Sequence, residues 1–285
     1  MKMKAFELLE LEKFPQPEPV NLDYPVLLCH GLGALGSILK KSLLHDVCTL
    51  YRLHCIKAVA PNIVPYAQIS VRAQAWAELV PSVLELFNTD RLHIVAHSMA
   101  GLDIRYMIHQ HELSESVISL TTVASPHRGS SLTGLTLNAP DSFKKSVIEI
   151  ANWFGNNVYP EMPSDMLGAL EQLSPEFVES EFNPNVPNHV DVVYQSVISA
   201  AGKGTDRDIS KLLIPFNTYM YDREGQNDGY VGKESAKWGE VIGETALSHL
   251  EQINVNLSSK RKPEWQELWL NVAKSLGKVE DNLND

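Results

Sequence analysis

A serine between small residues, Ser98, lies where a short apolar run meets a helical pattern. Residues 92–96 have the composition of a buried strand, and residues 98–110 carry apolar side chains at helical spacing. A sharp strand-to-helix turn needs tiny side chains two positions before and after the serine, and both are alanine here, Ala96 and Ala100. Such a turn exposes the hydroxyl beside a helix N-terminus, where developing negative charge is favoured. A packing serine is the alternative for this segment alone.

Asp228 and His249 could complete the chemistry of a serine nucleophile. Acyl transfer through a hydroxyl needs a base that takes the proton, a third group that orients the base, and donors for the developing oxyanion. Serine, acid and histidine, in that order along the chain, is one of the arrangements in which such triads occur. Asp228 lies in a loop at 225–231 after a predicted late strand, and His249 begins a predicted helix.

The chain has ten histidines, so a chance match is easy and the others need their own interpretation. His30 and His97 lie beside a glycine and the candidate serine, and we expect them to support the site. His109 and His111, at i and i+2 on a predicted helix, cannot face one metal ion together. We predict structural roles for His45, His54 and His93 and a loop position for His127.

Alternating strand and helix patterns predict the scaffold that positions these residues. Short β-type runs recur along the chain, separated by segments with apolar residues at helical spacing. The alternation indicates right-handed βαβ units, and hence an α/β fold with a mainly parallel central sheet flanked by helices. The predicted strands are 25–30, 53–60, 92–96, 117–123, 190–199 and 217–221, and the predicted helices are 36–51, 70–87, 98–110 and 263–276.

A glycine-rich loop, His30-Gly31-Leu-Gly-Ala-Leu-Gly, follows the first predicted strand. Its three glycines allow backbone N–H groups to turn inward toward a ligand. In enzymes that use a serine turn of this kind, the loop after this strand supplies one oxyanion donor. A flexible turn without such a role is equally compatible with the segment.

Between about 131 and 188 the alternation stops, and amphipathic helical patterns take over. One apolar stripe covers 143–154, and further helical pieces cover 164–173 and 175–182. Amphipathic helices inserted between core strands are typical of a mobile lid, and an ordinary helical subdomain is the alternative. We expect a single domain over 1–285 that contains this lid-like insertion.

Composition excludes several classes of protein. The net charge of −11 argues against nucleic acid as a partner, because phosphate neutralisation needs a basic face.

No run of about 18 apolar residues occurs, so we expect no transmembrane segment. An odd number of cysteines without metal-ligand spacing, Cys29, Cys48 and Cys55, indicates free thiols. No signal peptide is visible, so we expect a cytoplasmic protein, with leaderless export left open.

Five ordered sequence blocks resemble the bacterial true lipases and the related fungal triacylglycerol lipases of the α/β-hydrolase superfamily. The resemblance runs from about residue 25 to 256. The blocks are His30-Gly-Leu, Ala96-His-Ser98-Met-Ala-Gly-Leu-Asp-Ile-Arg-Tyr, Ser125-Pro-His-Arg-Gly-Ser130, Asn227-Asp228-Gly-Tyr-Val and His249-Leu-Glu-Gln-Ile-Asn.

The resemblance implies a role for each candidate residue. Ser98 would be the nucleophile, His249 the general base and acid, and Asp228 the acid that orients the base. The backbone N–H groups of Leu32 and Met99 would form the oxyanion hole, where each donor is typically worth about 10²–10³ in rate. The implied fold is an α/β-hydrolase fold.

The sequence also departs from this family. Members often carry a structural calcium ion, and the carboxylate after the catalytic histidine would be Glu251, but the glutamine expected four residues later is Val255. Asp206 or Asp208 could supply an earlier ligand. We expect no metal and no cofactor, with calcium as the minority alternative. Alanine at position 100, where the family has glycine, adds a methyl group to the turn.

The sequence therefore predicts a serine hydrolase that cleaves carboxylic esters of acyl lipids through an acyl-enzyme intermediate. The expected partners are an acyl ester or lipid substrate and, at its periphery, a lipid surface. An acyltransferase on the same fold is one alternative, because water exclusion depends on pocket shape. A non-catalytic protein that binds lipid or a partner is the other, and only Ala96 and Ala100 favour it.

Overall fold

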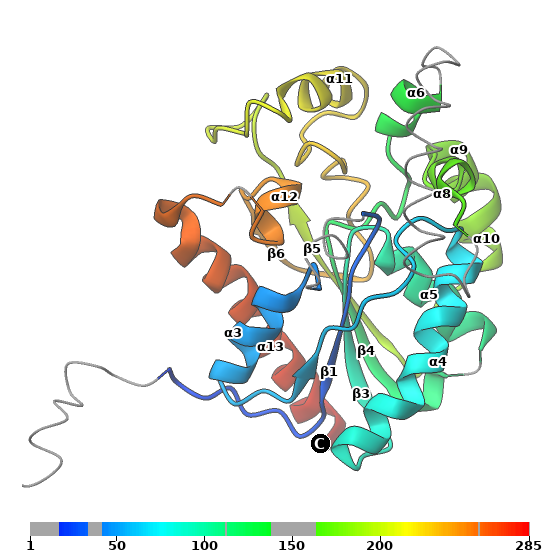
Figure 1. Ribbon diagram of the computed structural model, residues 1–285, viewed down its shortest axis with the longest axis vertical. Helices are drawn as coiled ribbons and strands as arrows, with labels where there is room; N and C mark the ends of the chain where they lie inside the picture. The colour runs from blue at the N-terminus through cyan, green and yellow to red at the C-terminus, as the bar shows by residue number, and fades with distance from the viewer. Residues whose placement is uncertain (1–16, 34–41, 112, 138–163, 256, 285) are drawn as a thin grey trace, which may run out of the picture.

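A parallel β-sheet forms the centre of the molecule (Figure 1). The computed structural model describes residues 17–33, 42–111, 113–137, 164–255 and 257–284. Within them, six strands lie in the order β2-β1-β3-β4-β5-β6, and all neighbours pair in parallel. The strands are β1 (Val26–Cys29), β2 (Ala58–Val59), β3 (Leu92–His97), β4 (Val117–Val123), β5 (Val193–Ser199) and β6 (Glu240–Thr245).

Helices cover both faces of the sheet, and a further group lies at the end where the strands finish (Figure 1). The described α-helices are α3 (His45–Leu53), α4 (Ile69–Phe87), α5 (Ala100–Gln110), α6 (Leu132–Leu137), α8 (Met166–Glu171), α9 (Pro175–Phe177), α10 (Asn183–Asn185), α11 (Ile214–Glu224), α12 (His249–Gln252) and α13 (Lys262–Asn284). Short helical turns of other types are η2 (Ser114–Ser116), η3 (Val178–Phe182) and η4 (Ser259–Arg261). No helix in this described part of the chain is both long and apolar enough to span a bilayer.

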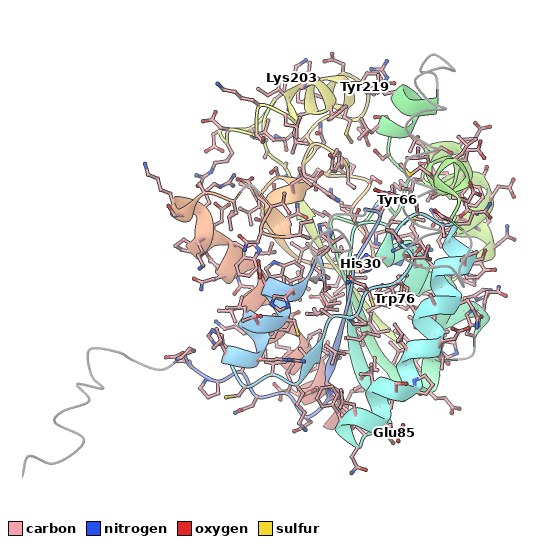
Figure 2. All side chains as sticks on the ribbon, in the orientation of Figure 1. His30, Tyr66, Trp76, Glu85, Lys203 and Tyr219 are labelled. Carbon is pink, nitrogen blue, oxygen red and sulfur yellow. The ribbon has the colours of Figure 1, made fainter. Side chains whose placement is uncertain are left out.

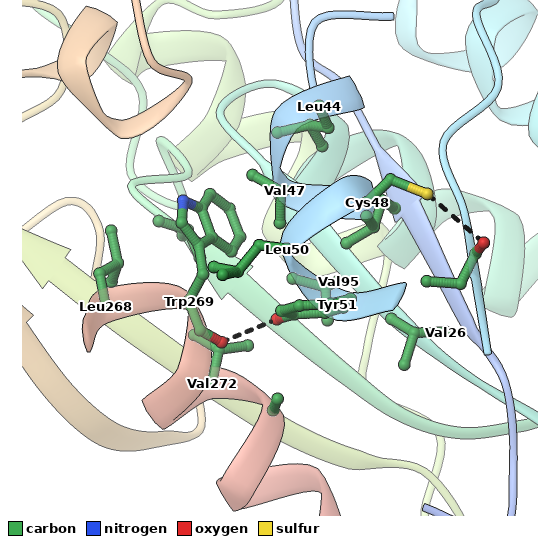
Figure 3. Close-up of a cluster of buried hydrophobic side chains, with 14 of the residues drawn as sticks. Val26, Leu44, Val47, Cys48, Leu50, Tyr51, Val95, Leu268, Trp269 and Val272 are labelled. Atoms are coloured by element: carbon green, nitrogen blue, oxygen red, sulfur yellow. Dashed lines mark hydrogen bonds between the residues drawn. The ribbon is translucent and has the colours of Figure 1, made fainter. Parts of the chain in front are cut away.

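Alternating side chains of the strands divide the core into two layers. In β1, Val26 and Leu28 join the cluster formed with α3 and α13, whereas Leu27 and Cys29 join the cluster formed with α4 and α5. This period of two is what a strand buried on both faces requires. In the first layer, the Tyr51 hydroxyl donates to a main-chain carbonyl of α13 at 3.0 Å (Figure 3).

Most of the predicted elements are confirmed. The last helix has its apolar stripe buried as predicted, although α13 continues to Asn284. The predicted helix at 36–51 is described only from residue 42 and appears as α3. Strands predicted at 25–30, 92–96, 117–123 and 190–199 are confirmed as β1, β3, β4 and β5, and helices predicted at 70–87 and 98–110 as α4 and α5.

Two strand predictions are wrong. Most of the segment at 53–60 is not a strand, because Leu53 ends α3 and Cys55 takes a left-handed conformation with a φ of 66°. The segment at 217–221 lies inside helix α11, which begins with a proline in its first turn. The sheet instead continues with β6, a strand that the sequence analysis did not predict.

Helices make up most of the described residues in the segment 131–188, where a lid-like insertion is predicted: α6, α8, α9, η3 and α10. α6, α8 and α9 lie beyond the end of the strands, and α10 lies beside α5 (Figure 1). The helix predicted at 143–154 lies outside the described residues. Near the end of the insertion, Arg105 of α5 donates to the Asn183 side chain and the Val186 carbonyl at 2.9 and 3.1 Å. These bonds tie α10 to the helix that follows the candidate serine.

A buried polar contact joins the last part of α13 to the start of β3 in the sheet. His93 of β3 lies 2.7 Å from the Ser119 hydroxyl and 3.0 Å from Glu280 Oε1. The Glu280 carboxylate also accepts the backbone N–H groups of Asp23 and Tyr24. Burial alone would raise the pKa of Glu280, but these hydrogen bonds outweigh it and hold the pKa below its usual range. The structural role predicted for His93 agrees with this contact.

We predict that Glu280→Gln lowers the free energy of unfolding at pH 7 by about 1–3 kcal/mol, because a charged acceptor is lost from a buried network. A carboxyl group with a lowered folded-state pKa stabilises the fold above its unfolded pKa, and this contribution disappears as pH falls through the folded pKa. Urea unfolding should therefore separate the variant from the wild type at pH 7 but much less once the pH has fallen below the lowered folded-state pKa of Glu280.

Glu267→Gln is the matched control, because Glu267 is an exposed residue of the same helix. Its unfolding free energy should stay within about 0.5 kcal/mol of the wild type. Equal effects of the two substitutions, or a Glu280→Gln effect that persists at low pH, would contradict the proposed contribution of this contact.

Candidate active site

The turn at Ser98 joins β3 to α5 in a strained conformation. Ser98 has a φ of 61°, in the left-handed region that residues with a side chain rarely adopt. Its backbone N–H donates to the Val123 carbonyl at the end of β4, at 3.0 Å. Ala96 and Ala100 are fully buried on either side. The small side chains therefore stand where a tight strand-to-helix turn requires them.

The structure brings Ser98, His249 and Asp228 together in one hydrogen-bonded chain. The Ser98 hydroxyl donates to His249 Nε2 at 2.9 Å, and His249 Nδ1 donates to Asp228 Oδ2 at 2.8 Å. His249 begins α12, and Asp228 lies in the loop between α11 and β6, not after a strand as the sequence suggested. A hydroxyl next to an imidazole that is itself oriented by a carboxylate can lose its proton as it attacks an electrophile.

The Asp228 carboxylate is completely buried and fully hydrogen-bonded. Oδ1 accepts the backbone N–H groups of Tyr230 and Val231 at 3.0 and 2.8 Å. Oδ2 accepts from His249 and, at 3.0 Å, from the side-chain amide of Gln252. Burial alone would raise the pKa of Asp228, but the charge and hydrogen bond of His249 and the backbone donors lower it overall. Asp228 is therefore ionised at neutral pH.

A pair of buried asparagines holds the loop that carries Asp228. Asn227 Oδ1 accepts from Asn217 Nδ2 at 2.8 Å and from the Gly229 backbone N–H at 2.9 Å. Asn227 Nδ2 in turn donates to the Asn217 carbonyl at 3.1 Å. Because Asn217 belongs to α11, this helix has a direct role in placing the acid.

The glycine-rich loop packs directly against the turn at Ser98. A side-chain carbon added to Gly31 would lie 2.6 Å from Ser98 Cβ and 2.9 Å from the Met99 nitrogen, so only glycine fits. Within the described residues, neither the Leu32 nor the Met99 backbone N–H donates a hydrogen bond. Two unpaired donors beside a candidate nucleophile are the arrangement that an oxyanion hole needs. Their assignment to that role stays a prediction.

Arg72 of α4 connects this loop to the helix after Ser98. Its guanidinium donates to the His30 and Val64 carbonyls, both at 2.7 Å, and to the Asp103 carboxylate of α5 at 2.8 Å. Both charged side chains are completely buried. The guanidinium of Arg72 therefore holds three segments around the site: the glycine-rich loop at His30, the chain at Val64 and helix α5 at Asp103.

His30 supports the loop as a neutral imidazole. Its Nδ1 donates to the Gly31 carbonyl at 2.9 Å, and its Nε2 accepts the Ile63 backbone N–H at 3.1 Å. Burial, together with the nearby Arg72 charge, lowers the pKa of His30 to about 3. The ring meets Trp76 edge-on at 5.6 Å (Figure 2). The supporting role predicted for His30 fits these contacts.

A mostly apolar cavity of about 300 Å³ opens beside Ser98. Side chains from the glycine-rich loop, the helical insertion and α12 line it. Leu32, Ser98 and His249 share this cavity, so a bound molecule would contact both the hydroxyl and the glycine-rich loop. Its apolar lining includes Leu43, Pro126, Leu132, Met166, Leu170, Leu173, Leu250 and Ile253.

The residues considered for calcium do not form a cation site. Glu251 accepts from the Ser248 N–H and hydroxyl, and its two oxygens lie 2.8 and 2.9 Å from Arg261 Nη1. A guanidinium therefore already neutralises this carboxylate. Asp206 and Asp208 are exposed, and no cluster of three or more potential metal ligands occurs within the described residues.

Comparison with known proteins finds triacylglycerol lipases among the proteins similar to this chain, although no family model matches it. The chain is 25% identical over 294 residues to a triacylglycerol lipase of Pseudomonas fragi, covering 91% of this chain and 98% of that lipase. It is 26% identical over 233 residues to triacylglycerol lipase 2 of Saccharomyces cerevisiae. This second match covers 79% of the chain but 65% of the yeast protein, slightly under two thirds of its length.

Among solved structures, a metagenomic carboxyl esterase superposes with a TM-score of 0.71 at 18% identity, covering 93% of this chain and 79% of that one. The chain has the α/β-hydrolase fold and is similar in sequence to triacylglycerol lipases. The parallel sheet, the turn at Ser98 and the order of the three hydrogen-bonded residues agree with the fold class predicted from the sequence.

Two residues of the site were missed by the sequence analysis. Arg72 precedes Trp76 by one helical turn and therefore lies on the buried face of α4, where an arginine signals a buried partner. Gln252 lies one turn after His249 on the same short helix. His97, predicted to support the site, is the last residue of β3, and its ring lies 4.6 Å from that of His249.

We predict that Arg72→Met lowers the free energy of unfolding by about 3–5 kcal/mol, because the Asp103 charge stays buried without its partner. The double variant Arg72→Met with Asp103→Leu should regain much of this loss, since the uncompensated charge is then removed. Urea unfolding of both variants at pH 7 measures the two values.

Arg207→Met serves as the control for loss of an arginine, because Arg207 is exposed. It should change the unfolding free energy by no more than about 0.5 kcal/mol. An Arg72→Met variant as stable as this control would show that the buried pair does not hold the site together.

Proposed function

We propose that this chain is a serine hydrolase that cleaves carboxylic esters of acyl lipids through an acyl-enzyme intermediate. The observation that carries the proposal is the hydrogen-bonded chain of Ser98, His249 and Asp228 at the wall of an apolar cavity. The similarity to triacylglycerol lipases over most of the chain supports the same reaction class.

The first half-reaction acylates Ser98. Its oxygen attacks the ester carbonyl carbon while His249 Nε2 takes the hydroxyl proton, and Asp228 stabilises the imidazolium that forms. The negative charge that develops on the carbonyl oxygen would be met by the Leu32 and Met99 backbone N–H groups. The carbon–oxygen bond to the alcohol then breaks, and the alcohol leaves with the proton from His249.

The second half-reaction releases the acid. His249 removes a proton from water, whose oxygen attacks the acyl carbon, and the same backbone donors would stabilise the second oxyanion. When the bond to Ser98 breaks, His249 returns the proton to the serine oxygen and the carboxylic acid departs. All proton transfers use these side chains and water, so the proposed chemistry needs no metal and no cofactor.

The lining of the cavity supports an acyl substrate. Its leucines and other apolar side chains offer an acyl chain a surface removed from water, whereas they offer a charged or strongly polar acid group no partner. The polar lining includes Ser98 and His249, with His97 and Tyr230 beside the His249 ring, and the ester itself would lie against these groups. This division of polar and apolar lining favours esters with an apolar acyl part.

We predict that Ser98→Ala loses hydrolysis of p-nitrophenyl butyrate by about 10³-fold or more, because the attacking atom is removed. The fold should be retained, with an unfolding free energy within about 1 kcal/mol of the wild type. Ser180→Ala, at an exposed serine of η3, should hydrolyse the ester at the wild-type rate. Undiminished hydrolysis by folded Ser98→Ala would end the assignment.

Exposed apolar side chains on neighbouring helices support a peripheral contact with a lipid surface. Leu135 of α6, Leu167 of α8, Leu212 just before α11 and Ile214 at its start are exposed by 37 to 64%. α6 contacts both of the other helices, and all three lie at the end of the molecule beyond the strands (Figure 1). An exposed apolar group of this kind is typical of an interaction surface.

We predict that Leu212→Asn combined with Ile214→Asn reduces co-sedimentation with phosphatidylcholine vesicles several-fold, since apolar area available to the lipid is lost. Hydrolysis of soluble p-nitrophenyl butyrate should not change. Leu86→Asn is the control, because Leu86 is an exposed leucine in the last turn of α4. This variant should bind vesicles as the wild type does. Equal binding by all three proteins would contradict the proposed surface.

A further inference from the structure

Gln252 is held rigidly from both its side chain and its main chain. Its side-chain Nε2 donates to Asp228 Oδ2 at 3.0 Å and to the Leu247 carbonyl at 3.2 Å. Its main-chain carbonyl accepts the indole N–H groups of Trp265 and Trp269, both at 2.9 Å. Gln252 is fully buried. Because both acceptors near Nε2 are oxygens, the amide has one orientation that satisfies its hydrogen bonds.

This orientation determines which ring nitrogen of His97 carries a hydrogen. The Gln252 Oε1 atom faces His97 Nε2 at 2.9 Å. An amide oxygen can only accept, so His97 Nε2 carries the hydrogen. The hydrogen bond to Gln252 acts to raise the pKa of His97, but burial, and then the neighbouring His249, outweigh it and lower this pKa to about 3. The ring beside His249 is therefore neutral wherever His249 can act as a base.

Among the described residues, one fixed negative charge, that of Asp228, lies next to the His249 ring. The titratable groups that face its ring are Asp228, His97 and Tyr230, whose ring meets it edge-on at 5.3 Å. Glu251, on the same helix, instead binds Ser248 and Arg261. The positive charge that His249 acquires during catalysis is therefore balanced by the carboxylate of Asp228.

We propose that Gln252 is a positioning residue, which holds Asp228 Oδ2 through its amide nitrogen and, through its amide oxygen, fixes the tautomer of the His97 ring beside His249. This inference rests on the proposed function, since it concerns the acid–base balance of the same site. A carboxylate at this position would add a second negative charge next to Asp228, and an apolar side chain would leave both Asp228 and His97 with one partner fewer. Either change should favour the protonated, inactive form of His249.

The test is the pH dependence of kcat/KM for p-nitrophenyl butyrate in Gln252→Met and Gln252→Glu. Methionine has nearly the shape of glutamine but neither donates nor accepts as an amide does. We expect Gln252→Met to lower kcat about tenfold or more with little change in KM, and to move the acid limb of the profile to higher pH. The ionised carboxylate introduced by Gln252→Glu should move the acid limb of the profile to still higher pH, by about one pH unit or more relative to the wild type.

Gln110→Met is the matched control, because Gln110 is an exposed residue at the end of α5 and should leave the profile unchanged. Thermal unfolding and titration of reactive serine with a fluorophosphonate give the fraction of intact sites in each protein. Should Gln252→Met not fold, the nearly isosteric Gln252→Glu provides the readout.

A shifted acid limb supports the proposal. A lower kcat with an unmoved acid limb in the folded variants would mean that Gln252 only stabilises the fold, and would overturn it. Variants that keep both the wild-type kcat and the wild-type limb would overturn it as well. In those two cases the wild type remains an active hydrolase, whereas a wild type that neither hydrolyses the ester nor reacts with the fluorophosphonate overturns the proposed function too.

Discussion

The left-handed conformation of Ser98, with a φ of 61°, is the constraint on which the site depends. A non-glycine residue in this region costs about 1–3 kcal/mol, so the surrounding structure must hold it there. β3 and the start of α5 fix the two ends of the turn, and the Val123 carbonyl accepts the Ser98 N–H. The close approach of Gly31 leaves no room for the turn to relax. The hydroxyl consequently lies outside the sheet edge, within reach of His249.

Each helical layer supports one half of the site with a buried polar group. On one face of the sheet, Arg72 of α4 fixes the glycine-rich loop and pairs with Asp103 of the helix after Ser98. On the other face, two tryptophans of α13 hold the Gln252 carbonyl, and the amide of Gln252 holds the acid. Because both supports are buried and hydrogen-bonded, the packing of the core sets the geometry of the site directly.

The local sequence pattern was sufficient to predict those elements whose intrinsic preference for strand or helix agrees with the way their apolar residues are buried. β3, the turn and α5 follow from a short apolar run, two alanines and helical spacing, and the order of Ser98, Asp228 and His249 indicated the hydrogen-bonded chain. The segment at 217–221 has β-type composition but becomes helix α11, because tertiary contacts such as those of Asn217 outweigh propensity. Arg72 and Gln252 act through partners far away in the chain, which no local pattern reveals.

The central claim is that His249 and Asp228 activate the hydroxyl of Ser98. The most direct test is the rate at which a fluorophosphonate labels the wild type, His249→Ala and Asp228→Asn, with the labelled residue located by peptide mass spectrometry. We expect labelling of the wild type at Ser98, and a fall in the labelling rate of about 10³-fold or more in His249→Ala, which lacks the imidazole. A label on another residue, or equal labelling of Ser98 in folded His249→Ala, would contradict the central claim.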